Sequence, residues 1–193
     1  MRLRIGKICV AAGVLAILLA VLLSQTVAGQ SHYSKAVDHL KTAIDLKQKR
    51  DLIGAEAHYR EAIRLEPGYA EAHYSYAILL ADRGDINGAI SESKKAIEIE
   101  KNYPEAHFNL AGYLRKKGDR DGEIKEYERA IAAAPNYAIA HFNLANSLVE
   151  RGDYDGAIVH YREYLRLAPK AKDAEQVKQV IKKLEGSALI VPE

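Results

Sequence analysis

Histidines that recur at one fixed spacing are the residues best suited to chemistry in this chain. Histidine binds transition metals and exchanges protons near neutral pH. Four of the seven histidines lie 34 residues apart, and they are His39, His73, His107 and His141. Zinc needs its ligands at about 2 Å from a single point, whereas equivalent side chains on stacked helices lie a packing distance of about 8–10 Å or more apart. We therefore expect no metal site, and we assign these histidines a role in packing.

Motifs for covalent or phosphate chemistry are missing from the sequence. It contains neither G-x-S-x-G nor H-E-x-x-H, and none of its glycines forms a phosphate-binding loop. The single cysteine, Cys9, lies within an N-terminal apolar stretch. Acidic residues recur at turn and solvent positions rather than pairing on one face. These observations predict a protein that is not an enzyme and that uses no cofactor.

The 34-residue period extends to other residue types and defines the elements that must position any site. Alanine, leucine, aspartate and glycine each recur in register with the histidines. The recurring sets are Ala43, Ala77, Ala111 and Ala145; Leu46, Leu80, Leu114 and Leu148; Asp51, Asp85, Asp119 and Asp153; and Gly54, Gly88, Gly122 and Gly156. A fixed period of this length is typical of stacked repeats rather than of one globular core.

Each period is predicted to form two helices joined by a tight turn. Between residues 70 and 103, small and apolar residues recur at helical spacing on both sides of Gly84 and Asp85. Glycine accepts the left-handed conformation that ends a helix, and aspartate caps the next one. Arg50 replaces this glycine in the first period, so the first turn is either distorted or strained by about 1 kcal/mol.

The units resemble the tetratricopeptide repeat, a family of paired helices with small and aromatic residues at set positions. The fourth unit carries this pattern at Leu144, Ala145, Leu148, Gly152, Asp153, Ala157, Tyr161 and Pro169. The resemblance implies an all-α solenoid of four helix-turn-helix repeats. Repeats 1 to 4 are residues 36–69, 70–103, 104–137 and 138–171. The recurring histidines stand where the family usually has tryptophan, and Glu123 stands where it has a small alanine.

In this family the first helix of each repeat lines a groove, and the resemblance places a candidate binding surface there. Aromatic side chains supply buried area, and amides pair with a peptide backbone. The candidate groove residues are Tyr74, Ser75, Phe108, Asn109, Arg115, Lys116, Phe142, Asn143 and Asn146. The alternative interpretation is that the aromatic residues pack between neighbouring helices and that the asparagines are only solvated.

The resemblance implies a non-enzymatic scaffold that binds a protein or peptide in the groove. The alternative is a structural subunit that assembles with itself, or within an envelope complex, through its outer faces and tail. Chaperone-binding members of the family grip a carboxylate with lysine and asparagine, and the matching positions here hold no basic residue, so we expect no carboxylate clamp.

Residues 1–29 are interpreted as an export segment. Arg2, Arg4 and Lys7 precede an apolar run of 16 residues, 8–23, and small residues surround Ala28. This run is slightly shorter than the ~20 residues that span a bilayer. A cleaved signal peptide and a retained anchor over residues 8–28 therefore both stay open. Either one places the repeats outside the cytoplasm, with the membrane contacted only through an uncleaved segment.

The rest of the chain completes the predicted layout. Residues 30–35 are a short linker, 172–186 a capping helix and 187–193 a tail. The helix has an apolar stripe and is expected to end at Gly186, and the stripe consists of Val177, Val180, Ile181 and Leu184. The formal net charge is +2, and removal of the three leader cations leaves 25 basic residues against 26 acidic ones, a charge of −1. This balance favours neither nucleic acid nor an anionic membrane surface as a partner.

Overall fold

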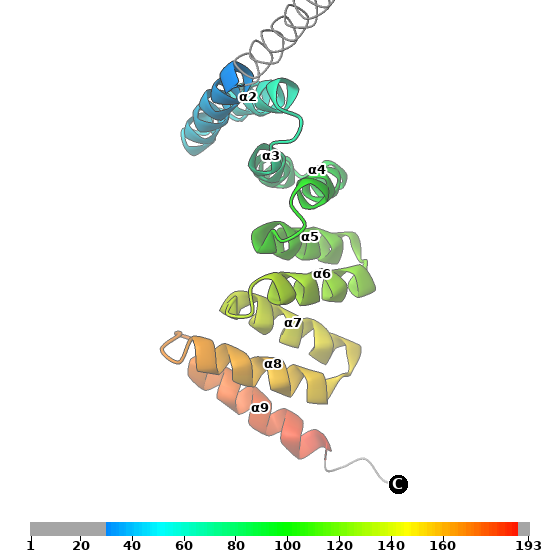
Figure 1. Ribbon diagram of the computed structural model, residues 1–193. Helices are drawn as coiled ribbons and strands as arrows, with labels where there is room; N and C mark the ends of the chain where they lie inside the picture. The colour runs from blue at the N-terminus through cyan, green and yellow to red at the C-terminus, as the bar shows by residue number, and fades with distance from the viewer. Residues whose placement is uncertain (1–29, 189–193) are drawn as a thin grey trace, which may run out of the picture. The chain divides into compact units, whose positions relative to one another are not determined.

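The computed structural model describes residues 30–188, and over this range it contains nine helices and no β-strand (Figure 1). The first helix covers residues 30–48. The others are α2 (Leu52–Leu65), α3 (Ala70–Asp82), α4 (Ile86–Ile99), α5 (Pro104–Lys117), α6 (Arg120–Ala133), α7 (Ala138–Arg151), α8 (Tyr154–Leu167) and α9 (Ala174–Ala188). The all-α fold expected from the period is confirmed for these residues.

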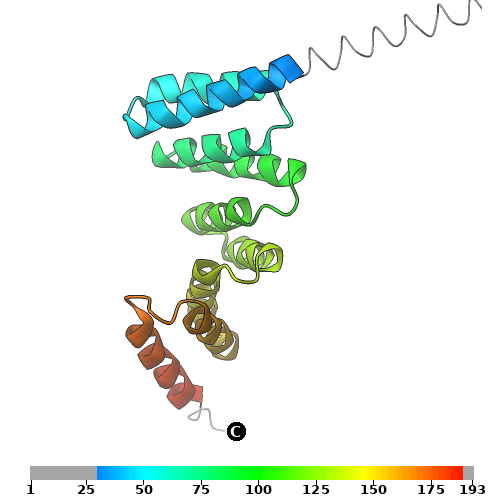
Figure 2. The same cartoon turned by 60° about the vertical axis from the view of Figure 1, so that its left-hand side comes forward.

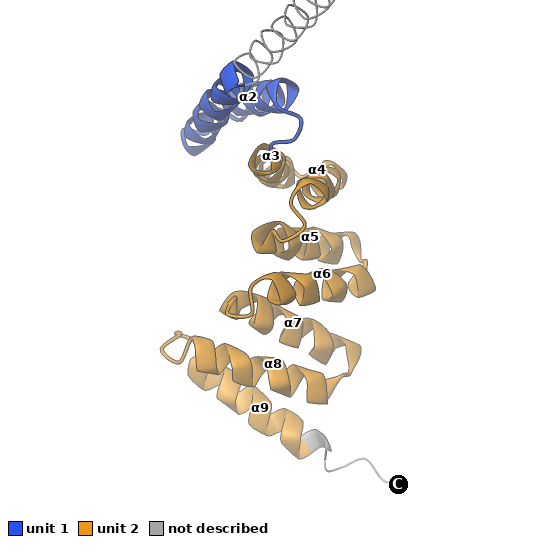
Figure 3. Ribbon diagram, in the orientation of Figure 1, with its two compact units in different colours: residues 1–69 blue, residues 70–193 orange. Residues whose placement is uncertain are grey.

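The chain divides into two compact units, one ending at Tyr69 and the other beginning at Ala70 (Figure 3). Unit 1 holds the helix over residues 30–48 together with α2. Its core includes Leu40, Ala43 and Tyr59, each at most 3% exposed. Unit 2 holds α3 to α9.

Unit 2 is a succession of helix pairs (Figures 1 and 2). α3 packs on α4, α5 on α6 and α7 on α8, and each second helix also contacts the first helix of the next pair. α9 packs on α8. Ala77, Ala111 and Ala145 are fully buried in the first helices of the three pairs. Because alanine is small, the helices can approach closely at these positions.

The turns follow the recurring aspartate and glycine. Gly118 ends α5 with φ 85°, and the Asp119 side chain then accepts a hydrogen bond of 2.9 Å from the backbone N–H of Gly122. A Cβ on Gly122 would lie 2.6 Å from an Asp119 carboxylate oxygen, which explains why glycine recurs three residues after each aspartate. Arg50 adopts the same left-handed conformation, with φ 64°. The first turn is therefore strained rather than rearranged.

Two predicted boundaries are wrong. Residues 30–35, predicted as a linker, are helical, since no proline or glycine separates them from repeat 1 and the Tyr33 ring lies 5.5 Å from that of Tyr69. Gly186 does not end the capping helix, because α9 continues to Ala188. One glycine near a helix end costs only about 1 kcal/mol relative to alanine.

The stripe of the capping helix also needs one correction. Val180 is 37% exposed, whereas Ala174, Val177, Ile181 and Leu184 are each at most 8% exposed. The buried face follows the spacing 174, 177, 181 and 184, which places residue 180 at its margin.

The predicted export segment 1–29, and residues 189–193 of the predicted tail, lie outside the described residues. Among the helices that the structure describes, none has the length and apolar character required to cross a bilayer.

Candidate functional site

The recurring histidines each contact a residue 19 positions further on, in the second helix of the same repeat. In repeats 2 and 3 this partner is a carboxylate: the Nδ1 atoms of His73 and His107 lie 2.6 Å from Glu92 and 2.7 Å from Glu126. In repeats 1 and 4 it is another histidine. The Nδ1–Nδ1 distances are 2.9 Å for His39 and His58 and 3.0 Å for His141 and His160. These recurring histidines, which we call the histidine ladder, thus link the two helices within each repeat.

The His–His pairs have the geometry of a hydrogen bond rather than of a metal chelate. The ring centroids of His141 and His160 lie 5.2 Å apart, close to the largest separation that a 3.0 Å nitrogen contact allows, so the two nitrogens face each other head-on. One nitrogen then donates its N–H to the lone pair of the other, which leaves no room for an ion between them. Within the described residues, no three metal-ligating side chains form a group that could hold an ion.

The His–Glu pairs are embedded in further charges. Glu126 contacts His107 and also accepts a 2.5 Å hydrogen bond from Arg129. Burial raises the pKa of Glu126, but His107 and Arg129 outweigh burial and hold this pKa below its ordinary value. For His160 the direction is also downward: burial lowers its pKa most, and His141 lowers it further. The two kinds of pair therefore respond differently to acid.

The predicted aromatic groove residues are half-buried, and each packs against a tyrosine ring at a tilted angle. The Tyr74 ring lies 5.0 Å from that of Tyr103, and the Phe108 ring 5.2 Å from that of Tyr137. Phe142 lies 5.1 Å from Tyr164. All three residues are thus in contact with tyrosine rings and stay partly accessible to solvent.

The predicted polar groove residues differ in how they are held. The Asn109 amide donates to the Tyr74 hydroxyl at 3.3 Å, and the Asn146 carbonyl accepts from the Tyr161 hydroxyl at 2.5 Å. Asn143 and Ser75 are half-buried, and Lys116 is exposed. The two asparagines are therefore oriented by tyrosines rather than simply solvated.

Sequence reasoning missed a buried carboxylate site around Glu123. This side chain is fully buried, and it accepts hydrogen bonds from Ser147 at 2.6 Å, Arg115 at 3.0 Å and Arg120 at 3.1 Å. Both arginines also bind Glu150: Arg120 Nη2 lies 2.9 Å from Oε2, and Arg115 Nη2 contacts Oε1. We call this closed set of four alternating charges, Arg115, Glu123, Arg120 and Glu150, the charge ring.

The charge ring joins repeats 3 and 4 and does not follow from the repeat pattern. Arg115 lies on α5, Arg120 and Glu123 on α6, and Glu150 on α7. One repeat earlier in the sequence, the equivalent positions hold Ala81, Ile86, Ala89 and Lys116. A comparison of all repeats would have revealed two charged replacements, Arg120 and Glu123, at positions where the other repeats hold uncharged residues.

An open cavity of about 390 Å³ lies beside the charge ring. It is lined by Arg115, Tyr127, Asn143, Asn146, Val149, Glu150 and Tyr161. Three of the nine predicted groove residues, Arg115, Asn143 and Asn146, are therefore brought together in one site. Its lining combines amide side chains, tyrosine hydroxyl groups and an arginine held in ion pairs. This set suits hydrogen bonding to a polypeptide better than it suits catalysis.

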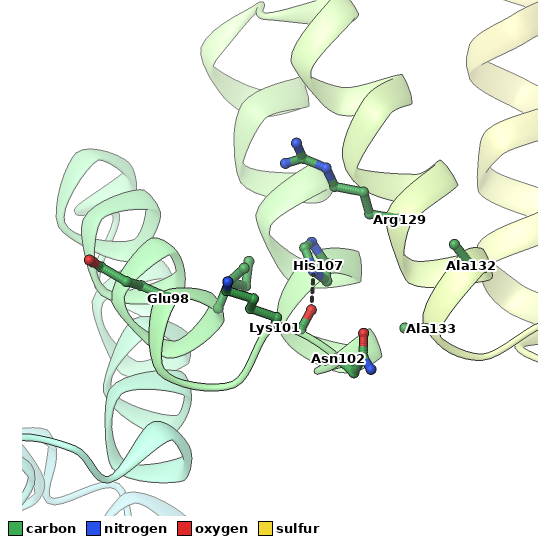
Figure 4. Close-up of a pocket in the computed structure, with 8 residues that line it drawn as sticks. Glu98, Lys101, Asn102, His107, Arg129, Ala132 and Ala133 are labelled. Atoms are coloured by element: carbon green, nitrogen blue, oxygen red, sulfur yellow. Dashed lines mark hydrogen bonds between the residues drawn. The ribbon is translucent and has the colours of Figure 1, made fainter.

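A second cavity, of about 500 Å³, contains none of the predicted groove residues (Figure 4). His107, Arg129 and Lys101 are among its lining residues, and His107 Nε2 lies 3.2 Å from the Lys101 carbonyl oxygen. Ile97, Ala132 and Ala133 supply an apolar part of its wall.

Two family models match the sequence. One, described as a tetratricopeptide repeat, matches residues 108–172, and another, described as a TPR repeat, matches residues 79–118. The chain is a tetratricopeptide repeat protein. No curated protein matches the sequence at a significant level.

Solved structures with the same fold include other tetratricopeptide repeat proteins. A MamA protein is 23% identical, with a TM-score of 0.70, over 79% of this chain and 83% of that one. PilF from Pseudomonas aeruginosa is 16% identical, with a TM-score of 0.69, over 82% and 71%. A repeat protein from Parabacteroides merdae is 16% identical, with a TM-score of 0.71, over 80% and 61%. The fold fits a protein-interaction scaffold.

Proposed function

We propose that this tetratricopeptide repeat protein is a non-enzymatic scaffold, exported across the cytoplasmic membrane, that binds an extended segment of a protein partner. The observation that carries the proposal is the cavity beside α7. There Asn143 and Asn146 lie with two tyrosines and Arg115 in one open site.

The lining matches the needs of a polypeptide backbone. An amide side chain both donates and accepts hydrogen bonds, as does each peptide unit of an extended chain. Tyr161 holds Asn146 through its hydroxyl group, so little side-chain entropy is lost when a ligand binds. Phe108 on α5 and Phe142 on α7 are partly accessible and add apolar contact area.

A structural subunit is the second candidate, favoured by apolar side chains on α8. Val159 is 61% exposed and Tyr154 42% exposed on this helix. In that role the second helices, rather than the cavity, would form the contacts.

Alanine variants separate the two functions. The purified chain would capture cross-linked partners from an envelope extract, and the affinity for a captured partner would then be measured. We expect Asn143→Ala and Phe142→Ala to weaken binding by about 1–4 kcal/mol, with the helical circular dichroism spectrum unchanged. Lys94→Ala, on the exposed face of α4, is the control. Full affinity in both Asn143→Ala and Phe142→Ala, with loss in Val159→Ser, would support the structural subunit instead.

Export is tested by expressing the intact chain in a Gram-negative host. We expect the protein outside the cytoplasm, because a basic start followed by an apolar run directs export. The N-terminus of the product distinguishes a chain cleaved near Gly29 from one that keeps residues 8–28 as a tether. Accumulation of the untruncated chain in the cytoplasm would contradict both forms of the proposal.

A further inference from the structure

The two carboxylates of the charge ring are held very differently. Glu123 is fully buried and accepts hydrogen bonds from two arginines and one serine. The Glu150 side chain is 41% exposed and lies in the last turn of α7. A buried carboxylate must stay paired because its desolvation is costly, whereas a half-exposed ion pair contributes little to stability because water screens it. Glu150 is therefore the exchangeable member of the ring.

The arginines present a preformed receptor to whatever carboxylate occupies the outer position. Glu123 fixes one terminal nitrogen of Arg115 and one of Arg120, and the second nitrogen of each points at Glu150. A guanidinium group stays charged at all relevant pH values. If Glu150 moved into solvent, two donors and one uncompensated positive charge would remain. That arrangement selects a carboxylate by charge and by the spacing of its two oxygens.

The neighbouring cavity indicates what would carry this carboxylate. Arg115 and Glu150 themselves line it, together with the Asn143 and Asn146 amides. A peptide whose main chain binds the amides would place a side chain within reach of the outer position of the ring.

We propose that the outer half of the charge ring receives the aspartate or glutamate side chain of a bound polypeptide, and that Glu150 occupies this place until a partner binds. This inference rests on the proposed binding function and specifies the partner chemistry. The exchange replaces one carboxylate by another, so both arginines stay paired throughout. The main-chain contacts at Asn143 and Asn146 then decide whether the partner displaces Glu150.

A small acidic probe tests this site without the natural partner. The probe is N-acetylglutamate N-methylamide, and its glutamine analogue is the neutral control. Binding to the purified full chain would be followed by NMR shifts of the Asn143 and Asn146 side-chain amides. We expect Glu150→Ala to bind the acidic probe roughly twofold to fivefold more tightly than the natural chain, as removal of one half-exposed competing ion pair would give. Adding Arg120→Gln should remove the gain.

Matched controls exclude a general charge effect. Glu128→Ala removes an exposed glutamate of α6 outside the ring, and we expect no gain from it. If Glu150→Ala loses its helical spectrum, Glu150→Gln, which keeps the length of the side chain, replaces it with the same expected result. Equal binding of the acidic and neutral probes, or an equal gain in Glu128→Ala, would overturn the proposal.

The experiments distinguish a failure of this inference from a failure of the proposed function. If Asn143→Ala weakens partner binding but Glu150→Ala gains no affinity for the acidic probe, the cavity is functional and the acidic specificity is wrong. If the probe binds as expected but the partner is unaffected by Asn143→Ala, the carboxylate receptor exists and the proposed partner surface is wrong.

Discussion

At the scale of single residues, Arg50 carries the clearest backbone strain among the described residues. Its φ of 64° brings Cβ close to the following carbonyl oxygen, which costs about 1–2 kcal/mol for residues other than glycine. The three equivalent turns use glycine at φ 85–87° and avoid this cost. The Arg50 side chain is exposed, so the position keeps arginine without gaining burial.

Replacing this arginine by glycine should stabilise repeat 1. We expect Arg50→Gly to raise the free energy of unfolding by about 0.5–1 kcal/mol, because relief of strain outweighs the greater freedom of glycine in the unfolded chain. Chemical denaturation provides the measurement. Gln48→Gly, at the last residue of the preceding helix, should have the opposite effect, a loss of up to about 1 kcal/mol. An unchanged or lower stability of Arg50→Gly would mean that the first turn gains something from arginine.

The repeat pattern predicted the backbone conformation of a residue better than it predicted the hydrogen-bond partners of its side chain. The left-handed position of Arg50 followed from its register with three glycines, since backbone geometry repeats with the period. Glu123 was recognised as a large residue at a packing position, but its three donors lie on α5, α6 and α7. Those contacts depend on side-chain directions across two repeats, which a 34-residue period does not encode.

At the scale of elements, the two helices within each repeat are linked by one of two kinds of histidine contact. Repeats 2 and 3 have a His–Glu contact, which becomes an ion pair when a histidine is protonated. Repeats 1 and 4 use His–His, which shares one N–H between two nitrogens and loses this hydrogen bond when the acceptor is protonated. Repeats of similar backbone structure therefore differ in the titratable groups that link their two helices.

Repeat 4 should weaken in mild acid through His160. The pKa of His160 is lowered in the folded chain by burial and by His141, so the unfolded chain binds its proton first. Stability is therefore highest above the unfolded pKa of about 6.5 and falls as the pH drops below that value. For Glu126 the folded pKa is lowered, so its contribution persists until the pH falls through about 4.5.

Replacing His160 by glutamate should make repeat 4 less sensitive to mild acid. We expect His160→Glu, which copies the His107–Glu126 pair, to lose less stability than the natural chain between about pH 7 and pH 5.5. Thermal unfolding at both pH values is the measurement. His32→Glu, at an exposed histidine outside the ladder, is the matched control and should leave the acid sensitivity unchanged. Equal losses in the natural chain and in His160→Glu would contradict this account.

Element ends were harder to predict than element identity. The Asp and Gly residues at each turn placed the ends of α3, α5 and α7 and the starts of α2, α4, α6 and α8, because the cap and the left-handed residue are local features. No such feature separates residues 30–35 from repeat 1, and Gly186 was mistaken for a stop because a glycine near a helix end is only weakly unfavourable. The site was predicted in part: Arg115, Asn143 and Asn146 line one cavity, whereas the charge ring beside it was not predicted.

At the scale of the whole molecule, the charge ring links repeats 3 and 4 of unit 2. Removing only the buried Glu123 should lower the stability of the chain. We expect Glu123→Ala to reduce the free energy of unfolding by about 1–3 kcal/mol, because Ser147 and two arginines lose their common acceptor. The triple variant Arg115→Ala, Arg120→Ile and Glu123→Ala copies the residues of repeat 2, and should lie within about 1 kcal/mol of the natural chain.

Denaturant titration of the single and triple variants measures this coupling. Because apolar residues can replace buried ion pairs at little cost, the triple variant should be more stable than Glu123→Ala. The opposite order would mean that the arginines are satisfied by water alone and that the ring does not hold repeats 3 and 4 together.

The charge ring also bears on how the length of this protein can change. Tandem units of equal length can be duplicated or deleted without disturbing the helical phase, since each unit contacts only its neighbours. Loss of repeat 4 would leave Glu123 without Ser147, and loss of repeat 3 would set Glu150 against the alanine and isoleucine of repeat 2. Of the two deletions, loss of repeat 4 should therefore cost more, because it leaves the buried Glu123 with fewer donors, whereas Glu150 is half-exposed and tolerates the apolar residues of repeat 2.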